Sequence, residues 1–216
     1  MNRLKIAITK GRLLDNSITM FDRAGLDTTP LKNPGRRLIH QIPNYGLDVV
    51  MAKAPDVITY VEHGVCDLGI VGKDTILEGG RSFYEVMDLG FGRCRFALAV
   101  KKGSDFYGTY RTRTIATKYP AVAAKFFASK GMDVAIIKIE GSVELAPILG
   151  LADAIVDIVE TGDTLKANGL EPVETICPIT ARLIVNTSSM KVYKSEILDL
   201  IGKCGDVIGK GGNGDD

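Results

Sequence analysis

The stretch whose residue types and spacing most clearly indicate a ligand site runs from Ala152 to Leu165, ADAIVDIVETGDTL. Its β-branched residues between 155 and 159 fit a strand covered on both faces, as strands of parallel sheets are. The turn that follows combines a glycine, two hydroxyls and the free N–H groups of a helix that begins near Thr164. This combination predicts a phosphate cradle, formed by Glu160, Thr161, Gly162, Asp163 and Thr164. The alternative is an ordinary strand-to-helix turn in which Asp163 or Thr164 caps the helix.

Carboxylates crowd this part of the chain. Six acidic residues and no Lys or Arg occur between 140 and 163, which is an odd lining for a bare phosphate but suits a sugar phosphate bound with Mg²⁺. The six are Glu140, Glu144, Asp153, Asp157, Glu160 and Asp163. We therefore favour a ribose phosphate over ATP alone. Neither G-x-x-x-x-G-K-[ST] nor G-x-G-x-x-G occurs, so neither P-loop nor dinucleotide-fold chemistry is indicated.

Two other turns place charge at the carboxyl end of a predicted strand, where ligands bind in open α/β sheets. The first is Lys10-Gly11-Arg12, after a strand over 4–9, and the second is Gly72-Lys73-Asp74, after a strand that begins at 67. Solvated cations are the alternative for the first turn, and we favour binding. Arg36 and Arg37 precede a strand over 38–42, where a functional role and an edge-strand charge are equally supported.

Composition limits the possible partners. The 216 residues carry 27 basic and 26 acidic side chains, a balance that argues against binding nucleic acid or a membrane surface through bulk charge. The four cysteines lack C-x-x-C spacing and are typical of reduced, buried thiols. A strand-like run starts at Leu4 with no charged-then-apolar leader, and no apolar stretch is long enough to span a bilayer. We expect a cytoplasmic protein that binds small molecules.

The alternation of strands and helices predicts an α/β protein with a second domain inserted in the first. The composition changes near residue 91, because nine Lys or Arg and one acid occur between 91 and 131. We interpret most of these cations as solvated or interface charge, with Lys118, just past a strand end, as the exception. We expect a discontinuous domain I over 1–90 and 179–208, domain II over 91–178, a disordered tail over 209–216, and a ligand cleft between the domains.

Five blocks of the sequence resemble ATP phosphoribosyltransferase, the family that begins histidine biosynthesis. They are ITKGRLLD at 8–15, YVEHGVCDLGIVGKD at 60–74, IATKYP at 115–120, EGSVELAP at 140–147 and LADAIVDIVETGDTLKANGL at 151–170. The resemblance implies two α/β domains around a cleft, similar to type II periplasmic binding proteins. It also implies attack of adenine N1 of ATP on C1 of phosphoribosyl pyrophosphate, with Mg²⁺. Adenine N1 has a lone pair and needs no general base, which suits a chain without a His or Cys catalytic arrangement.

The family's residue roles carry over onto matching positions. Its phosphoribosyl pyrophosphate loop falls on Asp157 to Thr164, and Arg12 and Arg36 would face the leaving pyrophosphate. The resemblance assigns the ATP side to Lys10, Gly11, Gly72, Asp74 and Lys118. Asp157 or Glu144 could contact Mg²⁺ held by the substrate. Lys53 stands where relatives often have Arg, and a Lys cannot make the same two-pronged contact.

The resemblance also implies partners. The chain resembles the short form, which works as a homodimer with a separate regulatory subunit related to histidyl-tRNA synthetase. Two alternatives remain at this point: a small-molecule binding protein of the same two-domain fold, and a purine-salvage phosphoribosyltransferase.

Overall fold

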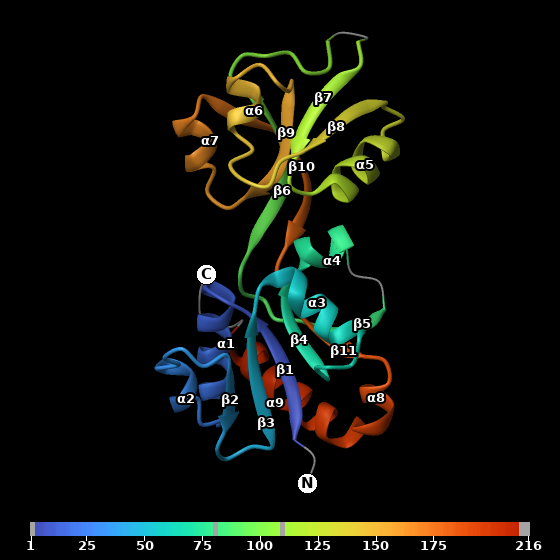
Figure 1. The fold of residues 1–216 in the computed structure, drawn as a ribbon. Coiled ribbons are helices and arrows are strands. Elements are labelled where there is room, and N and C mark those ends of the chain that lie inside the picture. Colours follow the sequence, from blue (N-terminus) through green and yellow to red (C-terminus); the bar gives the residue numbers. More distant parts are fainter. Residues whose placement is uncertain (1–2, 80–81, 109–110, 212–216) are drawn as a thin grey trace. The chain divides into compact units, whose positions relative to one another are not determined.

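The computed structural model describes residues 3–79, 82–108 and 111–211, which form two compact units (Figure 1). Unit 1 comprises the described residues up to Gly92 and from Thr180 onward, and unit 2 runs from Arg93 to Ile179. The sequence placed the corresponding borders after residues 90 and 178. Unit 2 is thus an insertion in the chain of unit 1.

Unit 1 is an α/β sandwich around a six-stranded sheet with the order β2-β3-β1-β4-β11-β5. Its strands are β1 (Leu4–Thr9), β2 (Ile39–Ile42), β3 (Leu47–Ala52), β4 (Leu68–Gly72), β5 (Phe83–Asp88) and β11 (Ala181–Asn186). Its helices are α1 (Arg12–Arg23), α2 (Thr29–Lys32), α3 (Ala54–Glu62), α4 (Lys73–Gly79), α8 (Ser189–Val192) and α9 (Lys194–Gly211). Strands β1, β3 and β4 are parallel, whereas β2, β5 and β11 pair antiparallel with their neighbours.

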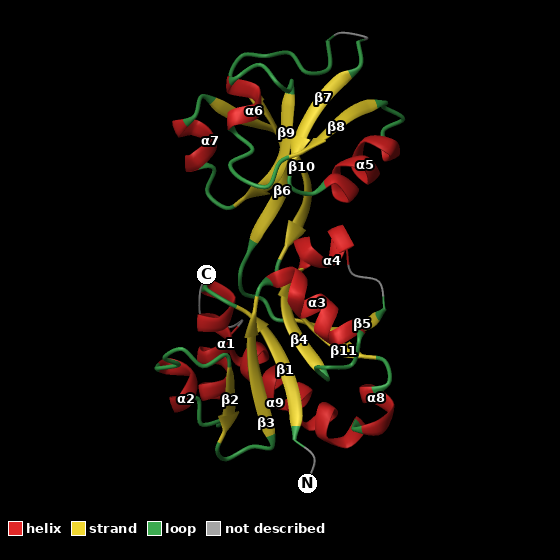
Figure 2. Ribbon diagram, viewed as in Figure 1, coloured by secondary structure: helices red, strands yellow, loops and turns green. Residues whose placement is uncertain are grey.

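Helices flank both faces of this sheet, as Figure 2 shows. Phe21 of α1 and Leu200 of α9 belong to the core on one face, and Val57 and Val61 of α3 belong to the core on the other. Gly69 of β4 lets α3 approach closely, because a Cβ at this position would lie 2.9 Å from a methyl carbon of each valine. The close approach fixes the start of α3 at the carboxyl edge of the sheet.

Unit 2 is a five-stranded mixed sheet with the order β10-β6-β9-β7-β8. Its strands are β6 (Cys94–Lys101), β7 (Arg113–Thr117), β8 (Val134–Lys138), β9 (Ala154–Val159) and β10 (Leu170–Ile179), and its helices are α5 (Pro120–Ser129), α6 (Leu145–Ile148) and α7 (Asp163–Ala167). Strands β7, β8 and β9 are parallel, and β6 runs antiparallel to both β9 and β10. Ala146 of α6 and Leu165 of α7 pack with Ile155 on one face of the sheet.

Three parts of the structure differ from the sequence prediction. Strand β5 was not predicted, because this half-exposed strand lacks regular apolar alternation. Helix α4 begins directly at Lys73, where the sequence indicated a turn. Helix α9 continues through Gly211 and so includes residues 209–211 of the predicted disordered tail, while 212–216 lie outside the described residues. Ile201, Val207 and Ile208 pack against the core and carry the helix this far. Among the described helices, none is long and apolar enough to cross a bilayer.

Candidate functional site

The carboxyl edge of the sheet in unit 1 gathers the predicted turns. Strands β1, β3 and β4 are parallel, so Lys10, Lys53 and Lys73, which follow their ends, share one edge. Strand β2 is antiparallel, so its amino end lies at this edge as well, and Ile39 pairs with Val50 near the end of β3. Topology therefore assembles cations from four segments along one edge.

The Lys10-Gly11-Arg12 turn is held by backbone contacts. The Lys10 N–H donates to the Ala52 carbonyl at 3.0 Å, and Gly11 adopts a left-handed conformation with φ of 84°. The Gly11 carbonyl then accepts the Leu14 N–H at 2.8 Å, and α1 begins at Arg12. Lys10, Gly11 and Arg12 are all exposed at the end of β1.

Arg36 lies in the exposed loop before β2. The Leu38 carbonyl accepts the Met51 N–H at 2.8 Å, which joins this loop to the end of β3. Since β3 alone separates β2 from β1, the strand axes that lead to Arg36 and Arg12 are about 10 Å apart. The structure thus places the two predicted arginines on one edge of one sheet.

The Gly72-Lys73-Asp74 segment has partners that the sequence did not predict. Lys73 Nζ lies 2.5 Å from Glu85 Oε2, and Arg182 contacts Glu85 Oε1 at 3.4 Å. The Asp74 carboxylate folds over Gly72 so closely that a Cβ on Gly72 would displace it. Glu85 was missed because it lies in β5, and only strand pairing with β11 brings it to Lys73.

The carboxyl edge of the unit 2 sheet gathers the second set of predicted residues. Strands β7, β8 and β9 are parallel and end at the same edge, followed by Lys118, by the acidic segment 140–144 and by the cradle 160–164. Lys118 is exposed and acts electrostatically on Asp157 of β9. The structure therefore brings five of the six carboxylates together with Lys118 at this edge. The sixth carboxylate, Asp153, lies at the other end of β9.

The residues of the predicted cradle form a turn that opens α7. Gly162 is left-handed with φ of 87°, and its carbonyl accepts the Lys166 N–H at 3.1 Å in the first turn of α7. Thr161 Oγ1 donates to Asp163 Oδ2 at 2.7 Å, which fixes the turn from within. Glu160, Gly162 and Thr164 follow the strand directly, with backbone donors of α7 beside them. Helix α7 begins at Asp163, one residue before the predicted start.

Asp157 is a partly buried carboxylate of this edge. It lies between Ile155 and Val159 on the strand face that α6 and α7 cover. Burial raises the pKa of Asp157 from 3.8 to about 6, the N–H of Ile158 and the Lys118 charge oppose this shift, and the neighbouring Glu144 charge adds to it. The ionised carboxylate of Asp157, near the end of β9, therefore lowers the stability of the folded protein.

We expect Asp157→Asn to stabilise the protein at pH 8 and to have little effect at pH 4. The pKa of the folded state exceeds the ordinary 3.8, so folding favours the protonated acid, and this advantage is lost as pH rises through about 6. The buried anion then costs on the order of 3 kcal/mol. Urea unfolding at both pH values measures the difference. An equal gain at pH 4 and pH 8 would contradict the buried-charge explanation.

The carboxylates also bear on metal binding. Within the described residues, no group of three or more His, Cys, Asp and Glu side chains is arranged to hold a metal ion. Asp157 and Glu144 lie within electrostatic reach of each other and could supply at most a pair of oxygen ligands. Such a pair fits Mg²⁺ that takes its other ligands from water and substrate phosphates.

Two α/β units with charged, glycine-containing turns at the carboxyl edges of their sheets are typical of proteins that bind phosphorylated ligands. Comparisons with known proteins specify the class. A family model described as HisG, ATP phosphoribosyltransferase, matches residues 53–204. ATP phosphoribosyltransferase from Clostridium kluyveri is 59% identical over 201 residues, 93% of this chain and 92% of that protein. The Clostridium novyi protein of the same name is 56% identical over 203 residues, 93% of this chain and 96% of that protein. This chain belongs to the ATP phosphoribosyltransferase family, pentosyltransferases that catalyse the first step of histidine biosynthesis.

Solved structures agree with this assignment. The ATP phosphoribosyl transferase (HisG:HisZ) complex from Thermotoga maritima matches with a TM-score of 0.81 and 35% identity, covering 96% of this chain and 99% of that chain. The alkanesulfonate-binding protein SsuA from Xanthomonas axonopodis matches with a TM-score of 0.58 and 11% identity, covering 96% of this chain and 73% of that chain. The second likeness shows the fold alone, which is the periplasmic-binding-protein fold that the sequence predicted.

Proposed function

We propose that the cradle after β9 binds phosphoribosyl pyrophosphate and that the residues on the unit 1 edge serve ATP and the leaving pyrophosphate. The observation that carries this proposal is the left-handed turn at Gly162, which follows β9 with its partly buried Asp157 and opens α7. Asp157, Glu160 and Asp163 would face ribose hydroxyls, and the backbone of Gly162 with Thr161 and Thr164 would face phosphate.

Arg12 and Arg36 would stabilise the pyrophosphate as its charge develops, since guanidinium groups bind phosphate through two parallel hydrogen bonds. The ATP side would comprise Lys10, Gly11, Gly72, Asp74 and Lys118, as the family resemblance implies. Lys73, paired with Glu85, would set the charge beside Asp74. These roles assign each residue to binding or to charge stabilisation, and none to proton transfer.

The positions of both histidines fit a mechanism that uses no general base. His40 is buried and its Nε2 lies 3.2 Å from the Arg37 carbonyl, and His63 is the C-cap residue directly after α3. Adenine N1 attacks with its own lone pair, so the chain's task is to orient the reactants and stabilise the departing charge. Mg²⁺, when bound with the substrate near Asp157 and Glu144, would neutralise phosphate charge.

The test is to incubate the purified chain with ATP, phosphoribosyl pyrophosphate and Mg²⁺ and to look for phosphoribosyl-ATP and pyrophosphate by mass spectrometry. Binding without turnover would favour a two-domain binding protein. Product from free adenine instead of ATP would favour a purine-salvage enzyme.

We also propose that the chain works in the cytoplasm as a homodimer together with a separate regulatory subunit. The support is the Thermotoga maritima structure, which is a complex of HisG with HisZ, and 99% of the matched chain in it is covered by this chain.

Free histidine is therefore expected to leave the activity of the purified chain unchanged, and inhibition should appear when the regulatory subunit is added. Steady-state rates with and without the subunit, across a histidine titration, measure this. Strong inhibition of the chain alone, not relieved by excess substrate, would contradict a separate regulatory subunit.

A further inference from the structure

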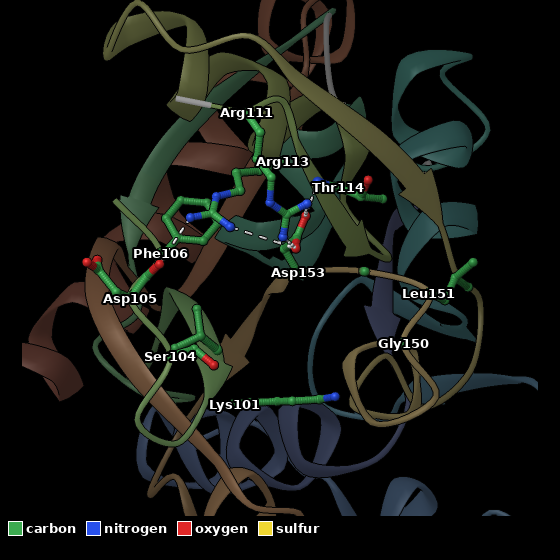
Figure 3. A pocket seen from close by; sticks show the side chains of 12 residues that line it. Lys101, Ser104, Asp105, Phe106, Arg111, Arg113, Thr114, Gly150, Leu151 and Asp153 are labelled. Carbon is green, nitrogen blue, oxygen red and sulfur yellow. Dashed lines mark hydrogen bonds and ion pairs between the residues drawn. The ribbon is translucent and has the colours of Figure 1, made fainter. Parts of the chain in front are cut away.

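Unit 2 has a pocket at the edge of its sheet opposite the cradle (Figure 3). Its volume is about 350 Å³, within the range of small-molecule sites. It lies where β6 ends and β7 and β9 begin. Its polar lining comes from Lys101, Ser104, Asp105, Arg111, Arg113, Thr114 and Asp153. The cations belong to the basic stretch 91–131, in which the proposed function gives a role to Lys118 alone.

Two guanidinium groups share one carboxylate in this pocket. Both Arg111 terminal nitrogens contact Asp153, one of them at 3.5 Å, and Arg113 reaches the same carboxylate at 3.9 Å. Although burial raises the pKa of Asp153, the Thr114 N–H and the Arg111 charge hold this pKa below its usual value. Asp153 is therefore an anion that compensates one positive charge of two.

The guanidinium group of Arg113 has an N–H donor without a hydrogen-bond acceptor among the described residues. Its side chain is only 9% exposed, and its Nε has no hydrogen-bond partner among the described residues. One terminal nitrogen donates to the Asp105 carbonyl at 3.0 Å, and the guanidinium lies 5.4 Å from the Phe106 ring centre. A buried guanidinium with so few acceptors makes the local potential positive.

A third cation stands opposite this pair. Figure 3 shows Lys101 extending across the pocket from Arg113 and Asp153, toward the loop at Gly150. Lys101 has no ion pair or side-chain hydrogen bond within the described part of the chain. The Asp105 carboxylate is occupied by its own loop, accepting the Gly108 N–H at 2.8 Å and the Tyr107 N–H at 3.2 Å. Three cations and two carboxylates thus line the pocket, which leaves a formal excess of one positive charge.

We propose that this pocket is a second anion site that takes a phosphate group, free or as a phosphomonoester. Lys101 and Arg111 supply charge-assisted donors, Ser104 supplies a hydroxyl, and Arg113 adds buried positive charge behind them. The site is separate from the substrate cradle, because the six residues of β9 put roughly 20 Å between Asp153 and Glu160. It does not depend on the proposed roles of the cradle residues.

The test is a titration of the ¹⁵N-labelled full chain with inorganic phosphate at constant ionic strength, followed by amide chemical shifts. A second arm with ribose 5-phosphate distinguishes a free phosphate from a phosphomonoester. We expect the Ser104, Thr114 and Gly150 amides to shift as one site, with a dissociation constant distinct from that of the Gly162 and Thr164 amides.

Lys101→Ala should weaken phosphate binding at the pocket about tenfold and leave the cradle signals unchanged. Lys102→Ala is the matched control, because Lys102 is an adjacent exposed lysine outside the pocket. Arg111→Ala should reproduce the loss. Pocket amides that do not respond, or equal effects of Lys101→Ala and Lys102→Ala, would overturn the inference. Silent cradle amides beside responding pocket amides would instead count against the proposed cradle.

Discussion

Replacing Arg36 or Arg12 by alanine should lower turnover by roughly a hundred- to a thousandfold, the equivalent of about 2.7–4 kcal/mol of lost transition-state stabilisation. Each arginine lies on the carboxyl edge of the unit 1 sheet, Arg12 at the start of α1 and Arg36 in the loop before β2. Since their strands are separated by β3 alone, the two side chains can approach one pyrophosphate from two directions. Neither substitution removes a core side chain, because both residues are exposed.

The conservative substitution refines this expectation. Arg36→Lys keeps the charge and loses the two-pronged contact, so its turnover should lie between those of wild type and Arg36→Ala. Arg37→Ala is the matched control, since Arg37 is the neighbouring exposed arginine and contacts His40 through its backbone carbonyl only.

Single-turnover rates with saturating substrates decide between catalysis and surface charge. A solvated edge arginine would change stability by at most about 0.5 kcal/mol when replaced by alanine and would not change the rate. An unchanged rate in Arg12→Ala or Arg36→Ala would remove that arginine from the mechanism.

Local patterns were sufficient to predict the positions of the carboxyl-edge turns. The apolar run at 4–9 coincides with β1, so the end of this strand, and hence Lys10, was placed correctly. The cradle was predicted for the same reason, because the β-branched run of β9 and the glycine after it are local signals.

Contacts between distant segments could not be predicted in this way. Lys73 meets Glu85 because β5 pairs with β11, which the chain reaches only after the whole of unit 2. Likewise, the cations Arg111 and Arg113 looked like solvated charge, and only the parallel pairing of β7 with β9 brings them to Asp153. One sequence carries the strand pattern of each segment but not the pairing that joins them.

Gly162→Val should weaken the binding of phosphoribosyl pyrophosphate about five- to 150-fold and leave ATP binding nearly unchanged. The left-handed φ of 87° at Gly162 is costly for a branched residue, by about 1–3 kcal/mol, so the turn would relax and withdraw its donors from the phosphate. The protein itself leaves room for a side chain, since the nearest atom to a Cβ there is a Val159 methyl at 3.7 Å. The expected loss therefore comes from backbone strain and from blocking the ligand's approach.

Gly169→Val is the matched control for this prediction. Gly169 is also left-handed, with φ of 71°, but it follows the other end of α7. Both variants should lose similar stability in urea unfolding, whereas isothermal titration should show weaker phosphoribosyl pyrophosphate binding in Gly162→Val alone. Equal binding of phosphoribosyl pyrophosphate by the two variants would place the phosphate contact elsewhere than in the turn after β9. The same conclusion would follow if Gly162→Val weakened ATP binding as much as it weakened phosphoribosyl pyrophosphate binding.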